Sequence, residues 1–162
     1  MADCGQATYA ARMSTGTASI VINATPEQVW EAIADVTRMG EWSLECVACR
    51  WVGDTSGPHV GARFEGDNEV RALGRVLKRW TTISEVTGCE PGRLFEFVAQ
   101  NHSTWRFDLE PQGGGTKVTE SFWYDAKGLQ RVVYDVLLRR PAAMTKGMGR
   151  TLERIRAGLD SA

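Results

Sequence analysis

The hydrophobic and polar positions of this chain change period twice, and each period predicts a different kind of element. A β-branched run at residues 17–24 predicts a short strand. It is followed by Thr-Pro-Glu-Gln at residues 25–28, which combines a capping threonine, a proline in the first helical turn and a glutamine that completes a capping box. We therefore expect a helix that extends to about Val36, and a second, shorter helical turn that ends near Trp42.

From Cys46 to Tyr124 the period becomes two, which predicts successive antiparallel strands joined by turns that contain Gly, Pro or Asn. Residues equidistant from a turn face each other, so the turns predict which side chains pair. The expected pairs are Gly66–Trp80, Val86–Phe97, Phe97–Phe107 and Phe107–Glu120. One face then carries Phe64, Gly66, Asn68, Trp80, Thr82, Ser84, Val86, Phe95, Phe97, Ala99, Trp105, Phe107, Leu109, Val118, Glu120 and Phe122.

The end of the chain, from Ala126 to Leu159, has apolar residues at helical spacing and predicts one long amphipathic helix. Pro141 predicts a kink within it. The flexible side chains of Met144 and Met148 suit either packing against a ligand or an ordinary core. The apolar stripe consists of Leu129, Val132, Val133, Val136, Leu137, Met144, Met148, Leu152, Ile155 and Leu159.

The aromatic face of the sheet and the apolar stripe of the helix are expected to pack together, because neither is stable in water. With 162 residues and 43% hydrophobic content, the chain is long enough for one well-buried core. We expect a single α+β domain over residues 17–160. Residues 1–16 are small and polar without a clear period, and we expect them to form a mobile arm.

Composition and charge narrow the possible partners. The formal net charge is -1 at pH 7 and the pI is about 6.1, so no overall field attracts nucleic acid or an anionic membrane. No apolar run approaches the roughly 20 residues of a membrane helix, and the N-terminus does not resemble a signal peptide. We expect a cytoplasmic protein without integral membrane association.

The four cysteines include a C-x-x-C at Cys46 and Cys49. These two residues lie in a predicted strand, where an offset of three directs side chains to opposite faces. We therefore expect two independent thiols that neither form a disulfide nor chelate a metal together. His59 and His102 show no metal-binding spacing, and no metal site is expected.

Glu120 is the candidate for acid–base chemistry, because the predicted register places its carboxylate on the aromatic face, where burial raises a pKa. The alternative is a glutamate that reaches solvent or pairs with Arg150 or Arg154 of the last helix. The candidate ligand-binding residues comprise polar groups that orient a ligand and apolar walls that enclose it. They are Asn68, Thr82 and Ser84, with Trp80, Phe97, Trp105, Phe107, Phe122, Met144 and Met148.

Other motifs argue against familiar catalytic sites. The sequence has neither a G-x-S-x-G elbow nor an H-E-x-x-H motif, and both histidines lie in predicted loops. The glycines at residues 113–115 fall in a predicted hairpin, so they do not form a phosphate-binding loop, and no cofactor is implied. The segment Trp42-Ser43 and the loop at residues 53–61 either border the mouth of a pocket or are plain connections.

Several short motifs carry a resemblance to a known family. They are Thr25-Pro26-Glu27-Gln28-Val29-Trp30, Gly40-Glu41-Trp42-Ser43, residues 89–95 (CEPGRLF) and residues 115–121 (GTKVTES). With the order of predicted elements, the chain resembles the polyketide cyclase/dehydrase-like branch of the START-like (SRPBCC, birch-pollen-allergen-like) superfamily. The resemblance implies a helix-grip fold, in which a curved antiparallel sheet of about seven strands wraps round a long C-terminal helix, with two short helices after the first strand. It also implies a cavity for lipids, steroids or polyketides.

Two classes of function remain open. One is binding or transport of a hydrophobic small molecule in an internal cavity, and the other is a polyketide cyclase or dehydratase that uses Glu120 as a general acid/base. The sequence favours binding, because it offers one candidate acid/base without a partner of matched pKa. It specifies neither the ligand nor the oligomeric state.

Overall fold

The computed structural model describes residues 14–100, 103–124 and 140–160. A β-strand opens the fold, three short helical segments follow, six further strands come next, and a long helix ends it. The elements are β1 (Ser14–Ile22), α2 (Pro26–Ala34), η1 (Val36–Arg38), α3 (Met39–Trp42), β2 (Cys46–Val52), β3 (Arg63–Ala72), β4 (Arg75–Glu90), β5 (Leu94–Ala99), β6 (Ser103–Gln112), β7 (Gly115–Tyr124) and α5 (Arg140–Asp160).

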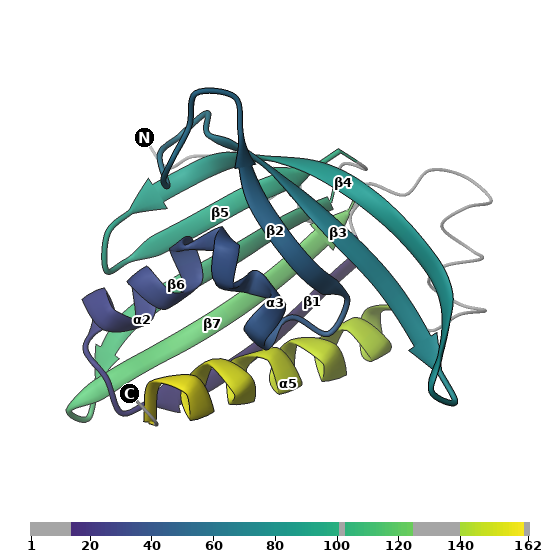
Figure 1. Cartoon of the computed structure of the whole chain (residues 1–162). Coiled ribbons are helices and arrows are strands. Elements are labelled where there is room, and N and C mark those ends of the chain that lie inside the picture. Colours follow the sequence, from purple (N-terminus) through teal and green to yellow (C-terminus); the bar gives the residue numbers. More distant parts are fainter. Residues whose placement is uncertain (1–13, 101–102, 125–139, 161–162) are drawn as a thin grey trace.

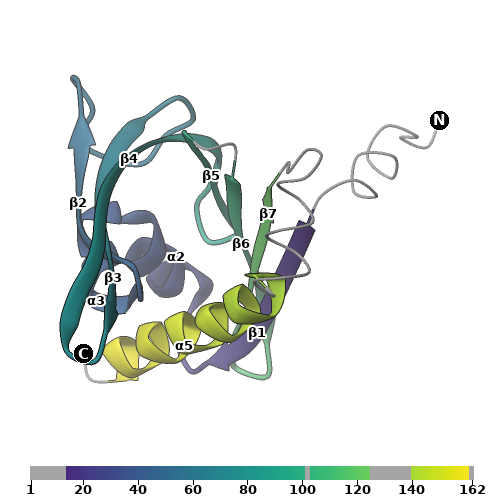
Figure 2. The same cartoon turned by 90° about the vertical axis from the view of Figure 1, so that its right-hand side faces the viewer.

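The seven strands form one antiparallel sheet in the order β1-β7-β6-β5-β4-β3-β2. The sheet curves strongly, and α2, α3 and α5 all lie on its concave side (Figures 1 and 2). Helix α5 packs along β1 and also contacts β7, α2 and α3. This is the helix-grip arrangement that the family resemblance implied. None of the helices in the described part of the chain is both long and apolar enough to span a membrane.

The first helix begins as its sequence predicts. Thr25 caps α2, its hydroxyl accepting from the Gln28 amide at 3.3 Å, and the Gln28 side chain accepts from the Thr25 amide at 3.0 Å. The Trp30 indole N–H then donates to the Leu94 carbonyl at 2.9 Å. This bond attaches α2 to the start of β5.

The register of the sheet confirms two predicted pairs, Val86–Phe97 and Phe107–Glu120. The other two are wrong by two residues, because Gly66 pairs with Thr82 and Phe97 pairs with Trp105. The two-residue shift at Gly66 arises in two steps. Ala72 pairs with Arg75 across the turn, and a register irregularity follows between Val70 and Arg71. A shift of two residues preserves the side-chain direction, so the predicted aromatic face remains intact.

The prediction that Cys46 and Cys49 point to opposite faces is wrong. A bulge in β2 shifts the register, so that Cys46 pairs with Asn68 while Cys49 pairs with Gly66. Asn68 and Gly66 lie two residues apart on the inner face of β3, and both cysteines therefore face inward. Their sulfur atoms lie 3.3 Å apart.

The two ends of the fold differ from the expected boundaries. Strand β1 starts at Ser14, three residues before the expected position. The predicted helical stretch at residues 126–139, with Leu129, Val132, Val133, Val136 and Leu137, lies outside the described residues, as does the N-terminal side of the kink expected at Pro141. The later part of the stripe is confirmed, because Met148, Leu152 and Ile155 are buried in α5.

The short helix α3 sits directly on strand β2, and Gly40 permits this approach. A Cβ atom at Gly40 would lie 2.5 Å from the carbonyl oxygen of Val47, closer than any side chain tolerates. The contact places Met39 over β2 and directs Trp42 toward the inner face of the sheet, where it meets Phe107. Glycine at this position thus brings two buried side chains into the core.

Candidate functional site

Glu120 lies in β7, between Ala18 of β1 and Phe107 of β6. Its side chain is only 3% exposed, and this burial raises the pKa of its carboxyl to about 8. The Oε2 atom has no hydrogen-bond partner among the described residues. The alternative of an exposed or arginine-paired glutamate is wrong, since Arg150 is exposed and Arg154 donates instead to the Ser43 carbonyl at 3.0 Å.

Aromatic side chains surround this carboxyl. Phe107 is directly opposite Glu120, and Phe122 is two residues further along the same face of β7; both are almost fully buried. The rings of Trp105 and Phe122 lie 4.5 Å apart. Met148 of α5 packs against the same cluster, so the helix and the aromatic face meet next to Glu120, as predicted.

Trp42 is a site residue whose role the sequence did not reveal. The sequence placed it at a pocket mouth or in a plain connection, but its side chain is 6% exposed and its ring meets Phe107 edge-on, with 6.2 Å between ring centroids. The indole Nε1 atom is buried without a hydrogen-bond partner among the described residues. The feature of the sequence that could have indicated this role is a tryptophan at the end of a predicted short helical turn.

The predicted polar residues on the other half of the sheet form a separate group. Asn68 donates from Nδ2 to the Gly66 carbonyl at 2.9 Å and to the Thr82 hydroxyl at 3.1 Å. Ser84 is buried opposite Phe64, while Trp80 is half-buried with the Lys78 ammonium 5.3 Å from its ring centroid.

Three strands separate β3 from β7, so the structure does not bring the polar residues of β3 and β4 next to Glu120. Phe97 of β5 is buried between the two groups and contacts Phe64, with 5.1 Å between ring centroids. The side chain of Met144 lies outside the described residues. The predicted ligand-binding residues therefore share one face but form two groups on it.

A surface hollow of about 810 Å³ lies between α2, the loop after β2 and the last turn of α5. Its wall contains none of the predicted ligand-binding residues. Two of its charged side chains already have partners, because Asp35 caps η1 and Arg38 pairs with Glu41 at 2.8 Å. The unpartnered buried polar atoms instead lie beside Phe107, which makes that region the stronger candidate site.

The described residues contain no cluster of three or more His, Cys, Asp or Glu side chains able to hold a metal ion. The chemistry of the candidate site therefore comes from a neutral carboxyl, an indole N–H and aromatic walls. This set suits an apolar molecule that carries one or a few polar groups.

Comparison with known proteins agrees with this geometry. The family model described as polyketide cyclase / dehydrase and lipid transport matches residues 13–160. The solution structure of the Polyketide_cyc-like protein Cgl2372 from Corynebacterium glutamicum is 36% identical, with 91% of this chain and 92% of that chain covered and a TM-score of 0.62. None of the curated proteins matches the chain.

Two more distant structures share the fold. Protein MLL2253 from Mesorhizobium loti is 21% identical, with 91% of this chain and 98% of that chain covered and a TM-score of 0.64. Protein NE0264 from Nitrosomonas europaea is 13% identical, with 91% and 94% covered and a TM-score of 0.69. With its family-model match spanning nearly every described element, the chain belongs to the polyketide cyclase/dehydrase and lipid transport family.

Proposed function

We propose that the protein binds a hydrophobic small molecule, such as a lipid, polyketide or steroid-like compound, between the inner face of the sheet and α5. The observation that carries this proposal is a pair of buried polar atoms next to Phe107 that have no hydrogen-bond partner among the described residues: the Oε2 atom of Glu120 and the Nε1 atom of Trp42.

Each of these atoms is costly to bury alone, by about 1–3 kcal/mol. A ligand oxygen that accepts from the Trp42 indole recovers part of this cost. With a pKa of about 8, Glu120 is largely protonated at neutral pH and donates a hydrogen bond to a carbonyl or hydroxyl oxygen. The site thus favours a neutral, oxygen-bearing ligand over an organic cation.

Catalysis is the second candidate, and the pKa of Glu120 supports it. A carboxyl that titrates near neutral pH is suited to general acid/base chemistry, as the cyclisation or dehydration of a polyketide requires. However, the described residues provide no second buried carboxylate without a charged partner, since the other buried one, Glu69, pairs with Arg71 and Arg79. This absence favours binding, because paired acid and base groups are the usual arrangement for such chemistry.

Titration with the methyl ester of cis-parinaric acid, a fluorescent lipid that is neutral at pH 7, tests the binding proposal. We expect saturable binding, weakened by Trp42→Phe up to about tenfold, because this variant keeps the aromatic ring but loses the N–H. Glu120→Gln retains hydrogen-bonding capacity and should shift the affinity by no more than about 1–2 kcal/mol. Glu96→Gln, on the outer face, is the matched control and should bind like the wild type. Binding that none of the inner-face variants alters would contradict the proposed site.

A cyclisation assay with a poly-β-keto substrate separates the two candidates. If Glu120 is a general acid/base, Glu120→Gln lowers turnover by about 10²- to 10⁴-fold while substrate affinity stays nearly unchanged. If the protein is a binder, the wild type and the variant both lack turnover. Native mass spectrometry of the protein purified from its own host then identifies the class of the co-purifying ligand.

A further inference from the structure

Cys46 and Cys49 form a buried pair of thiols on the inner side of the edge strand β2. Their side chains are 5% and 9% exposed, and their sulfur atoms are 3.3 Å apart. The bulge that brings them together pairs Cys46 with Asn68 and Cys49 with Gly66. A regular strand directs residues i and i+3 to opposite faces, so the bulge is what creates this contact.

The residue opposite the pair leaves room for both sulfur atoms. A Cβ atom at Gly66 would lie 3.2 Å from Cys49 Sγ and 3.4 Å from Cys46 Sγ, which is tight contact. On the other side, the Met39 sulfur lies 3.7 Å from Cys49 Sγ. The dithiol is thus enclosed by β3 and α3, and the nearby charges of Asp67 and Arg50 have smaller effects on the pKa values of its thiols than the contact between the two sulfur atoms has.

We propose that Cys46 and Cys49 are a redox-active dithiol that closes to a disulfide when a small peroxide enters the core, and that a thiol reductant reopens. The contact between the two sulfur atoms means that little chain movement separates the reduced form from the bonded form. Burial selects a small oxidant over a protein disulfide.

The two cysteines have different roles in this reaction. The hydrogen bond between the two sulfur atoms lowers the pKa of Cys46, while the same bond and burial raise the pKa of Cys49. The Cys46 thiolate is therefore the nucleophile, and Cys49 is the resolving thiol.

In the first step, the Cys46 thiolate attacks one oxygen of hydrogen peroxide; the S–O bond forms, the O–O bond breaks, and the leaving hydroxide becomes water by taking up the proton that the Cys46 thiol released. In the second, Cys49 sulfur attacks the sulfenic sulfur; the S–S bond forms, the S–O bond breaks, and the Cys49 proton leaves with the hydroxyl as water. One peroxide is thus reduced to water as two thiols are oxidised.

Mass spectrometry of the full-length protein tests the proposal. The reduced protein is treated with about a tenfold excess of hydrogen peroxide, and the remaining thiols are alkylated after unfolding. Both cysteines fall in one tryptic peptide, residues 39–50, so the disulfide appears as that peptide without alkylation and lighter by two hydrogen atoms. Dithiothreitol should restore the two alkylation sites.

Three single variants assign the roles. Cys49→Ser should form no disulfide and should accumulate a sulfenic acid at Cys46 that dimedone traps. Cys46→Ser should react with peroxide at least about tenfold more slowly, because it lacks the lower-pKa thiol. Cys89→Ser is the matched control: burial raises the pKa of Cys89, and its loss should leave the reaction unchanged.

Three results would overturn the proposal. They are full alkylation of residues 39–50 after peroxide treatment, a cross-link to Cys4 or Cys89 instead, and a stoichiometric metal ion held by the two thiols in the freshly purified reduced protein. Even if a serine variant fails to fold, the measurement on the wild-type peptide still shows whether peroxide forms the disulfide. Because none of these readouts uses a bound hydrophobic molecule, their outcome is independent of the proposed binding function.

Discussion

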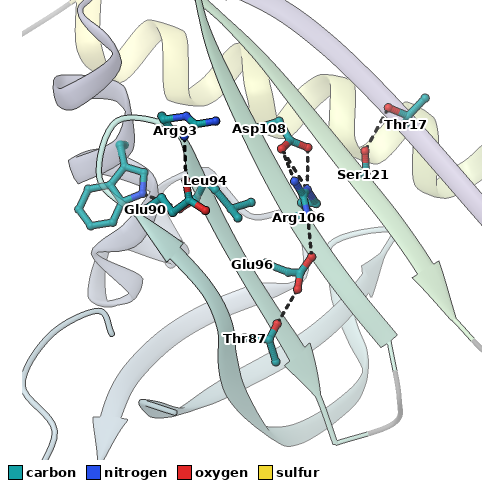
Figure 3. Close-up of polar contacts among 10 residues, drawn as sticks. Thr17, Thr87, Glu90, Arg93, Leu94, Glu96, Arg106, Asp108 and Ser121 are labelled. Carbon is teal, nitrogen blue, oxygen red and sulfur yellow. Dashed lines mark hydrogen bonds and ion pairs between the residues drawn. The ribbon is translucent and has the colours of Figure 1, made fainter. Parts of the chain in front are cut away.

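Glutamate side chains have opposite environments on the two faces of the sheet. On the outer face, Glu96 accepts from the Thr87 hydroxyl at 2.8 Å and pairs with Arg106 at 3.4 Å, as Figure 3 shows. On the inner face, Glu120 is buried against Phe107 and its Oε2 atom has no partner in the described part of the chain. The outer carboxylate is paired with an arginine, whereas the inner carboxyl is held neutral near pH 7 by burial.

This difference shows which face carries function. Arg106 also donates to Asp108 at 2.8 Å, so these three outer-face charges have partners within the chain and require no ligand. These bonds raise the pKa of the Arg106 guanidinium further. The inner face keeps polar atoms that have no hydrogen-bond partner in the part of the chain that the structure describes, an arrangement that native proteins retain chiefly at functional sites.

The largest expected difference between the two faces is in their contribution to stability. Substitutions of two neighbouring residues of β6 measure it. Phe107→Ala removes a ring that is 1% exposed and should lower the free energy of unfolding by about 3–5 kcal/mol. Arg106→Ala, one residue earlier on the outer face, should cost no more than about 1 kcal/mol, since its ion pairs are partly exposed. Urea unfolding followed by circular dichroism gives both values. Similar losses in the two variants would show that the faces do not differ in this way.

The next effect is the dependence of stability on pH. The pKa of Glu120 is about 8 in the folded protein and about 4.5 when unfolded, so the folded state holds one more proton between these values. The free energy of unfolding should therefore fall by about 1.4 kcal/mol per pH unit as pH rises through this window, and this loss should end above about pH 8.

Glu120→Gln should remove this slope, because glutamine does not ionise, and should raise the stability at pH 7 by up to about 3 kcal/mol, the loss that the wild type accumulates between about pH 4.5 and pH 7. Glu96→Gln makes the same isosteric change on the outer face and should retain the slope. The measurement is a series of urea titrations of the wild type and both variants from pH 5 to pH 9. If the wild type and Glu120→Gln show the same dependence of stability on pH, the carboxyl of Glu120 is not held neutral in the folded protein.

The smallest effect concerns the ion pairs of the outer face. A double-mutant cycle with Arg106→Ala and Asp108→Ala should give a coupling energy of about 0.2–1 kcal/mol at low ionic strength. Raising the salt to about 1 M should reduce it, because exposed charges are screened over a few ångströms. If the coupling energy does not change with salt, the ion pair is shielded from solvent, and the outer face resembles the inner face in its burial.

Local sequence determined the elements and the two faces. The period of two between Cys46 and Tyr124 separates aromatic from charged side chains even where the predicted pairing is wrong by two residues, because alternation along a strand does not depend on its partner. Thr25 and Gln28 cap α2 by bonding to each other across three positions of the chain. Because this contact is local, the sequence was enough to predict the start of the helix, which is confirmed.

Tertiary structure decided the contacts that carry the chemistry. The burial of Glu120, the arrival of Trp42 at Phe107 and the meeting of Cys46 with Cys49 each depend on elements far apart in the chain or on a bulge set by a neighbouring strand. Periodicity assigns a side chain to a face, but its solvation and hydrogen bonds depend on what covers that face. Only the folded chain brings those covering groups together.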